Sequence, residues 1–229
     1  MGHRLSKISP IYSRKKNLSN KKGICKIKWK CGDIYEGEFK NCKLNGLGTY
    51  ISDKYIYKGE FLDNMKHGKG SIKFKKFKNK YKGEFSFNYP NGFGIYNFHR
   101  YHNKILIPYI YIGEMLLGKM YGIGKLYKNG TLIYYGEIKE GYYDGYGISF
   151  YKNGKINYVG KFKNNLFDGE GILYNFNNNI QFMGIFYKNK IKHKLIVTNK
   201  NIKKIKDKVY SNINFNLSII YAPQKEELH

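Results

Sequence analysis

Alanine, arginine and cysteine are all scarce in this chain of 229 residues. Ala222 is its one alanine, and leucine and valine are few, which excludes a core of packed aliphatic layers. Three arginines leave few side chains for bidentate recognition of nucleic acid bases. Cys25, Cys31 and Cys42 fit neither a zinc-binding spacing nor a disulfide framework, so they are interpreted as reduced thiols.

Long apolar runs are also missing. No stretch approaches the roughly 18 apolar residues that a membrane-spanning helix needs, and the first residues do not resemble a signal peptide. The sequence therefore predicts a cytoplasmic protein that is not secreted and has no transmembrane segment. Association with the cytoskeleton or with the inner face of a membrane stays open.

Acidic residues are few, because 16 Asp and Glu stand against 42 Lys and Arg, for a formal net charge of +26. Such an excess favours an anionic partner, namely an acidic protein, anionic lipid or nucleic acid. Codon usage of an AT-rich genome would also raise lysine, so part of the charge needs no functional explanation.

Aromatic residues and glycine are abundant, with 24 Tyr, 15 Phe and 26 Gly. They follow a repeat: the segment Tyr35-Glu36-Gly37-Glu38-Phe39 has an equivalent every 22 to 24 residues, apart from one interval of 30. Seven copies begin near residues 35, 57, 81, 111, 134, 158 and 182.

A Gly-x-Gly motif begins nine residues after the first glycine in each of the first six copies, and the seventh copy has lost it. An eroded copy is also predicted before the first, because Tyr12 lies 23 residues before Tyr35 and Gly23 falls in the first Gly-x-Gly position. The structural glycines of the repeat are Gly37, Gly46, Gly48, Gly59, Gly68, Gly70, Gly83, Gly92, Gly94, Gly113, Gly122, Gly124, Gly136, Gly145, Gly147, Gly160, Gly169 and Gly171.

Alternation indicates strands: Tyr35, Gly37 and Phe39 share one face, and Glu36 and Glu38 share the other. Each copy is interpreted as a two-stranded hairpin whose glycines leave room for a neighbouring ring. A single hairpin is marginal in water, so the copies must stack. Fourteen strands at about 4.8 Å each would form a twisted sheet about 65 Å long.

The Tyr-x-Gly-Glu-Phe and Gly-x-Gly pattern resembles the MORN repeat (membrane occupation and recognition nexus) over about residues 35 to 194. It departs from the family pattern by having Phe, Met or Ile where Trp is commoner, and Lys161 in place of Glu. The resemblance implies an elongated antiparallel sheet and a role as a scaffold or adaptor, or as an appendage of an enzyme such as a lipid kinase.

The predicted fold is all-β: an elongated, single-layer, twisted antiparallel sheet of tandem hairpins with a short helix/strand cap at the C-terminal end. Its parts are a basic leader (1–22), the repeat array (23–194) and a tail (195–229). In the tail, Ile202, Ile205 and Val209 have helical spacing. Alternating residues from Ile213 to Ile219 predict a strand that covers the last edge of the sheet.

The leader carries a loose myristoylation pattern at Gly2, although His3 is unfavourable for acylation. A basic segment strengthens the weak membrane binding of one acyl chain. The candidate contacts with anionic lipid are Arg4, Lys7, Arg14, Lys15, Lys16, Lys21 and Lys22.

No combination of residues indicates catalysis, a cofactor or a metal. The row formed by Glu38 and its equivalents Glu60, Glu84, Glu114 and Glu137 is expected to make cross-strand ion pairs with lysine. His99 and His102, in the long interval, lack further ligands, and a surface loop is predicted there.

The sequence therefore predicts a scaffold, not an enzyme, that binds cytoskeletal or membrane-skeleton proteins and can form a homodimer. Binding of anionic phospholipid, or attachment to a lipid kinase, is the alternative, and nucleic acid is disfavoured. The candidate binding face is aromatic and comprises Tyr35, Phe39, Tyr57, Phe61, Tyr81, Phe85, Tyr111, Tyr134, Tyr158 and Phe162.

Overall fold

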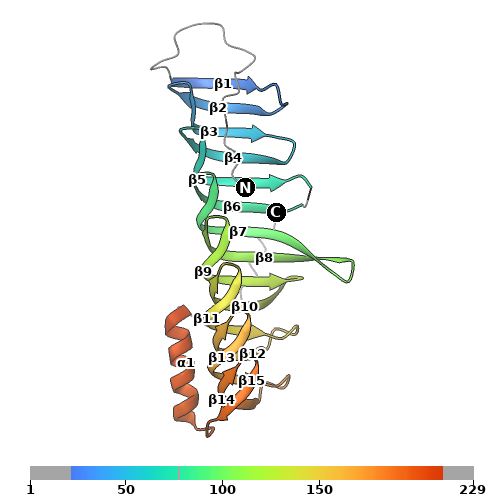
Figure 1. Cartoon of the computed structure of the whole chain (residues 1–229), viewed down its shortest axis with the longest axis vertical. Coiled ribbons are helices and arrows are strands. Elements are labelled where there is room, and N and C mark those ends of the chain that lie inside the picture. Colours follow the sequence, from blue (N-terminus) through green and yellow to red (C-terminus); the bar gives the residue numbers. More distant parts are fainter. Residues whose placement is uncertain (1–21, 77, 214–229) are drawn as a thin grey trace. The chain divides into compact units, whose positions relative to one another are not determined.

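The computed structural model describes residues 22–76 and 78–213, which form fifteen strands and one helix (Figure 1). The strands belong to one sheet and lie in it in chain order, so the predicted all-β repeat sheet is confirmed. The strands are β1 Lys22–Lys28, β2 Ile34–Lys40, β3 Lys43–Ile51, β4 Tyr55–Leu62, β5 Met65–Phe74, β6 Lys80–Ser86, β7 Tyr89–His102, β8 Ile105–Leu116, β9 Lys119–Lys128, β10 Thr131–Lys139, β11 Tyr142–Phe150, β12 Ile156–Lys163, β13 Leu166–Tyr174, β14 Ile180–Tyr187 and β15 Lys190–Lys194.

The chain divides into two compact units, which are described separately below. Unit 1 comprises residues 1–120 and 128–130, and unit 2 comprises residues 121–127 and 131–229. Unit 1 contains β1 to β8, and unit 2 contains β10 to β15 and the helix.

Tight two-residue turns connect the strands within each copy. Asp63 and Asn64, between β4 and β5, both have positive φ, at 48° and 69°. Two left-handed residues define the type I′ turn, whose twist matches that of the flanking strands. The same geometry recurs in unit 2, where Asn164 and Asn165 have φ of 49° and 67°.

These turns are also bonded to one another from copy to copy. The backbone N–H of Asn64 donates to the carbonyl oxygen of Leu44, and the N–H of Leu44 donates to Oδ1 of Asn64 at 2.8 Å. Asn165 makes the same pair of bonds with Tyr143. An asparagine at the second turn position thus joins consecutive hairpins, as do Asn88 with Lys66 and Asn189 with Phe167.

The first strand, β1, extends the array by one strand beyond the fourteen expected. Gly23 pairs with Phe39, just as Gly46 pairs with Phe61 in the next copy. Cys25 stands opposite Gly37 in the position of the second glycine. The strand β1 therefore has the register of the second half of a repeat, while Tyr12 lies outside the described residues.

The third and fourth copies meet in a long hairpin. Residues His99 and His102 lie within β7, not in the loop that the sequence predicted, because β7 and β8 stay paired up to His102 opposite Ile105. The strand β6 begins at Lys80, opposite Asn97, so the hairpin extends past the ends of β5 and β6 (Figure 1).

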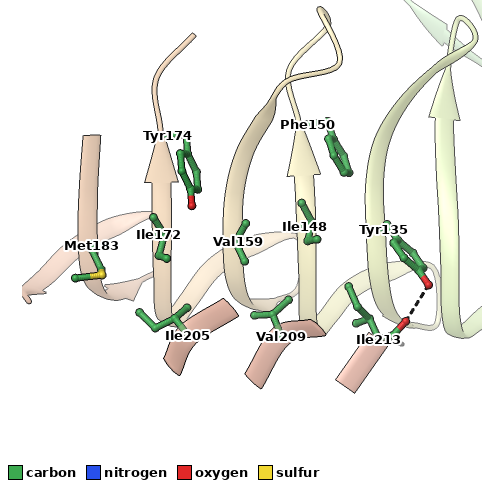
Figure 2. Close-up of a cluster of buried hydrophobic side chains, with 10 residues drawn as sticks. All are labelled: Tyr135, Ile148, Phe150, Val159, Ile172, Tyr174, Met183, Ile205, Val209 and Ile213. Carbon is green, nitrogen blue, oxygen red and sulfur yellow. Dashed lines mark hydrogen bonds between the residues drawn. The ribbon is translucent and has the colours of Figure 1, made fainter. Parts of the chain in front are cut away.

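The helix α1, Asn199–Ile213, confirms the helical prediction for the tail and packs on a face of the sheet in unit 2. Ile213 was predicted to begin an edge strand, but it is the last residue of α1 and is buried near Tyr135 of β10 (Figure 2). Ile205, Val209 and Ile213 form one i, i+4, i+8 stripe, which explains the difference. Residues 214–229, with the rest of that predicted strand, lie outside the described residues.

Within the described ranges, α1 is the only helix, and it is neither long nor apolar enough to cross a bilayer.

Candidate functional site

The tyrosine that opens each copy is packed on the glycines of its own hairpin. A Cβ on Gly37 would lie 2.7 Å from the Tyr35 hydroxyl, and one on Gly48 would lie 2.5 Å from the same ring. Gly37 and Gly48 are directly paired across β2 and β3. The two glycines therefore provide the space for the tyrosine ring, as the sequence predicted.

The hydroxyl of this tyrosine has a fixed partner. Tyr57 donates to the carbonyl oxygen of Glu60 at 2.8 Å, and Tyr134 donates to that of Glu137 at 2.7 Å. Burial raises the pKa of Tyr81 to about 12 and raises the pKa of Tyr57 as well, so these hydroxyls stay protonated near neutral pH. Six copies share the bond, in Tyr35, Tyr57, Tyr81, Tyr111, Tyr134 and Tyr158.

Phenylalanines close the space between successive tyrosines. Phe61 contacts Tyr35 and Tyr57 edge-on, with ring centroids 5.2 and 5.1 Å apart. Phe85 lies in the same way between Tyr57 and Tyr81, at 5.0 and 5.2 Å. Edge-to-face contact at these distances is a favourable aromatic geometry, so the rings form a continuous core.

The prediction of an aromatic binding face is wrong for nine of its ten residues, since they are at most 5% exposed and only Phe39 is partly exposed. A ring that is packed against glycine on one side and against other rings at its edges offers no surface to a partner. The buried nine are Tyr35, Tyr57, Phe61, Tyr81, Phe85, Tyr111, Tyr134, Tyr158 and Phe162.

Two carboxylates of the predicted row accept hydrogen bonds from backbone N–H groups. Oε1 of Glu60 accepts the N–H of Lys69 at 2.8 Å, and Oε1 of Glu137 accepts the N–H of Tyr146 at 2.7 Å. Lys69 and Tyr146 are the middle residues of Gly-x-Gly motifs, where the strand pairing shifts register. At these two positions the expected ion pair with lysine is replaced by a bond to an N–H that the bulge leaves unpaired.

A further position was missed in the sequence, two residues before each Gly-x-Gly. In unit 2 it holds Tyr143 and Phe167, which stack on Tyr134 and Tyr158 at 3.7 and 4.0 Å. In unit 1 the second copy has Lys66 there. Its Nζ donates to the hydroxyl of Tyr55 at 3.0 Å and lies 4.4 Å from the ring centroid.

The other side of the sheet, here called the opposite face, carries the residue that follows each opening tyrosine. In unit 2 this residue is Tyr135 or Val159, and its equivalent in the seventh copy is Met183, which follows Phe182; all three are buried. They form a core with Ile148 and Ile172 from the neighbouring strands (Figure 2). Helix α1 covers this apolar surface with Ile205, Val209 and Ile213.

In unit 1 the opposite face is mostly polar over β3 to β6, apart from Leu47 and the directly paired Ile51 and Ile56. Ser71 of β5 stands between Lys58 and Lys82, and Lys73 pairs directly with Lys80. Like charges directly opposite each other destabilise a sheet unless an anion lies near them. Lys58, Lys73, Lys80 and Lys82, here named the lysine patch, form none of the ion pairs found among the described residues.

On β7 and β8 the opposite face of unit 1 becomes mostly apolar, although Asn97, His99 and Glu114 also lie on it. Ile95 and Ile112 pair directly and are half-buried, and Tyr101 pairs with Leu106 farther along the hairpin. Phe93, Tyr101 and Leu106 are 55%, 75% and 41% exposed. The β7–β8 band is defined here as Phe93, Ile95, Tyr101, Leu106, Pro108, Ile110 and Ile112.

The remaining predicted sites are the metal ligands considered in the sequence and the basic leader. No group of three or more His, Cys, Asp or Glu residues is placed to hold a metal ion in residues 22–76 and 78–213. Gly2 and the leader's basic residues lie outside these ranges, except Lys22, which begins β1.

Hairpins joined by tyrosine-on-glycine packing define a tandem β-hairpin repeat protein. The family model of the MORN repeat matches residues 35–55, 57–76, 81–99, 134–156 and 158–180, and the chain belongs to the MORN-repeat proteins. The matches start at five of the seven copies identified in the sequence, and the copies at 111 and 182 are not matched. A comparison with curated proteins gave no match.

Proposed function

We propose that this protein is a non-catalytic scaffold that binds protein partners in a cytoskeletal or membrane-associated assembly of the cytoplasm. The supporting observation is the projecting part of the β7–β8 hairpin, in which Tyr101, Ile105 and Leu106 are 75%, 67% and 41% exposed. MORN repeats occur in scaffolds that bind proteins or membranes, and their fold is not typically catalytic.

Exposing apolar side chains on a narrow two-stranded ribbon costs free energy. Arg100 to His102 pair with Ile105 to Ile107, beyond the start of β6. A two-stranded ribbon alone is marginally stable in water, and an exposed apolar patch marks a site of interaction. A protein partner that covers these side chains would bury the apolar patch and stabilise the two-stranded ribbon.

Proximity labelling in cells tests the proposal. The full chain, fused to a labelling enzyme, is compared with the double variant Tyr101→Ser, Leu106→Ser and with the control Leu47→Ser, whose side chain is 61% exposed on β3. We expect cytoskeletal or membrane-skeleton proteins with the wild type and the control, and at least tenfold less labelling with the double variant. Recovery of no such protein with the wild type would refute the scaffold.

Binding of anionic phospholipid is a second candidate function, favoured by the lysine patch. The facing pair Lys73 and Lys80 concentrates positive charge that a phosphate-rich surface would neutralise. We expect Lys80→Gln, Lys82→Gln to reduce sedimentation with phosphatidylserine vesicles more than Lys30→Gln, Lys190→Gln, which removes the same charge elsewhere. Equal losses would indicate general electrostatic attraction, which salt screens.

Attachment to a lipid kinase and homodimer formation are further proposals for the same assembly. Kinase activity that copurifies with the tagged chain supports the first. A mass of 54 kDa in solution, twice the 27.0 kDa of the chain, supports the second.

A further inference from the structure

The protein contains its own example of how the opposite face takes up a helix. In unit 2, α1 places Ile205, Val209 and Ile213 over paired residues of neighbouring strands (Figure 2). Ile148 pairs with Val159, and Ile172 pairs with Met183. Each of these pairs joins the residue after a Gly-x-Gly motif to the residue after the aromatic residue that opens the next copy, Tyr158 or Phe182.

Register identifies the equivalent pair in unit 1 as Ile95 and Ile112. Earlier copies have Thr49 with Lys58 and Ser71 with Lys82 at these positions, so they could not bury an apolar helix. Ile51 pairs with Ile56 on the same face farther along β3 and β4, but at the position that meets the helix in unit 2 the change from polar to apolar falls on β7 and β8. Within the described residues of unit 1, no helix is present to cover them.

The β7–β8 band extends along two strands, whereas α1 crosses β10 to β13, so a helix on the band would lie along the strands and not across them. The band has the length of a helix. The eight steps from Phe93 to Tyr101 extend about 26 Å at about 3.3 Å per residue. A helix of about 17 residues has the same length at about 1.5 Å per residue. Phe93 and Tyr101, which mark the two ends of the band on β7, are 55% and 75% exposed.

Charge identifies the kind of helix. Lys82 is directly opposite Ile95, and Lys80 is directly opposite Asn97, so the lysine patch borders the band. A helix lying on the band therefore gains from carboxylates along the side that faces β6. The α1 of a second copy is unsuitable, because it carries five lysines and one aspartate.

We infer that the β7–β8 band binds an amphipathic helix of a partner protein, with an apolar stripe at i, i+4 and i+8 and acidic residues toward Lys80 and Lys82. This inference rests on the proposed scaffold function and specifies its partner. The binding mode is that of a helix docked by its apolar face, with charge fixing its orientation.

A designed peptide provides the probe. Its sequence is that of α1, Asn199–Ile213, with all five lysines replaced by glutamate, and a side-chain staple on the polar side keeps it helical. Titration into the full chain, followed by fluorescence anisotropy, is expected to show binding that weakens at high salt. The same stapled peptide with its lysines retained is the charge control, and we expect it to bind at least tenfold more weakly.

Variants then locate the binding site. We expect Phe93→Ser, Tyr101→Ser to raise the Kd of the glutamate peptide at least tenfold, since both side chains are exposed and their loss leaves folding intact. Lys80→Glu, Lys82→Glu should do the same, whereas the control Lys30→Glu, Lys190→Glu should not. Unchanged binding to the serine variant would show that the peptide binds outside the band and would overturn the inference.

The inference and the scaffold proposal can fail separately. If the labelled partners of the full chain are retained by Phe93→Ser, Tyr101→Ser, the scaffold stands and the helix site is wrong. A third outcome is that Phe93→Ser, Tyr101→Ser no longer sediments with phosphatidylserine vesicles and that the wild type binds no peptide. The band is then a membrane contact, and the inference is again wrong. If Phe93→Ser, Tyr101→Ser loses both the labelled partners and the binding of the peptide, the result supports both proposals.

Discussion

The hydroxyl of Tyr135 donates a 2.8 Å hydrogen bond to the carbonyl oxygen of Ile213 and so attaches the last residue of α1 to β10 (Figure 2). The two residues are 78 positions apart in the chain, and both are buried. Carbonyl groups at the end of a helix have no partner within it, so a side-chain donor there is stabilising.

Removal of this donor should loosen the end of α1 without releasing the helix. For Tyr135→Phe we expect a loss of about 1 kcal/mol, the usual contribution of one such bond. Amide hydrogen exchange at residues 210–213 should become about fivefold faster, with residues 199–205 unchanged. Equal acceleration along the whole helix would contradict a local role.

A charge in the apolar stripe of α1 should detach the whole helix. Val209 is 1% exposed, and Val209→Asp would place an unpaired carboxylate among Ile148, Val159 and Ile172. Since an uncompensated buried charge costs about 3 kcal/mol or more, the helix is expected to leave the sheet. Hydrogen exchange should show all of α1 unprotected, while the exposed control Lys203→Asp keeps its protection.

Methyl groups on the repeat glycines should be poorly tolerated. A Cβ at Gly171 would lie 2.1 Å from the Tyr158 hydroxyl and 2.2 Å from its ring. Gly171→Ala must displace a fully buried ring, which we expect to cost about 3 kcal/mol in urea unfolding. Gly154→Asn is the control, because nothing lies within 4 Å of a Cβ there and asparagine tolerates its φ of 80°.

The asparagine bond between turns can be tested without changing the turn. Asn165→Gly keeps a residue that adopts φ of 67° but removes the Oδ1 that accepts the N–H of Tyr143. We expect a loss of about 1 kcal/mol and faster exchange of the Tyr143 amide. Asn153→Gly, in an exposed loop of the same unit, is the control and should leave that amide unchanged.

Lys66 should make stability depend on pH in an identifiable way. Burial lowers the pKa of Lys66 from 10.5 to about 8, so folding disfavours its charged form. The unfolded chain therefore binds more protons between about pH 8 and 10.5, and stability rises with pH in that window. Below pH 8 the full free-energy cost of burying the charged Lys66 ammonium is present.

Lys66→Met removes this titration. The variant should exceed the wild type in unfolding free energy at pH 7, and the difference should shrink as the pH rises from 8 to 10.5. Urea unfolding at a series of pH values measures it, and comparison with the wild type cancels the contribution of the tyrosines other than Tyr55, whose hydroxyl accepts the Lys66 hydrogen bond. A difference that does not change with pH would show that Lys66 has its ordinary pKa.

The sequence predicted those features that depend on period and spacing. The alternation of Tyr35, Gly37 and Phe39 predicted strands, and the regular distance between Gly37 and Gly46 predicted which residues lie together. It also predicted α1 from Ile202, Ile205 and Val209. Each of these inferences used contacts within one copy or one helical turn.

Features that depend on contacts between copies were missed. The rings were expected to be exposed because the sequence does not show that Phe61 fills the gap between Tyr35 and Tyr57. The bond from Leu44 to Asn64 joins residues 20 positions apart, and its only signal is the recurrence of asparagine in the turns. Ile213 continues the i, i+4, i+8 stripe of Ile205 and Val209, but the sequence does not show that this stripe ends beside Tyr135.

The path of α1 back to β10 has a consequence for synthesis of the chain on the ribosome. Ile148, Val159 and Ile172 become available early in the synthesis of unit 2, but the helix that covers them is made last. Hairpins of unit 1 can close one after another as they emerge. Unit 2 keeps an uncovered apolar surface until residue 213 has left the exit tunnel. It is therefore the part of the nascent chain that we expect a chaperone to bind.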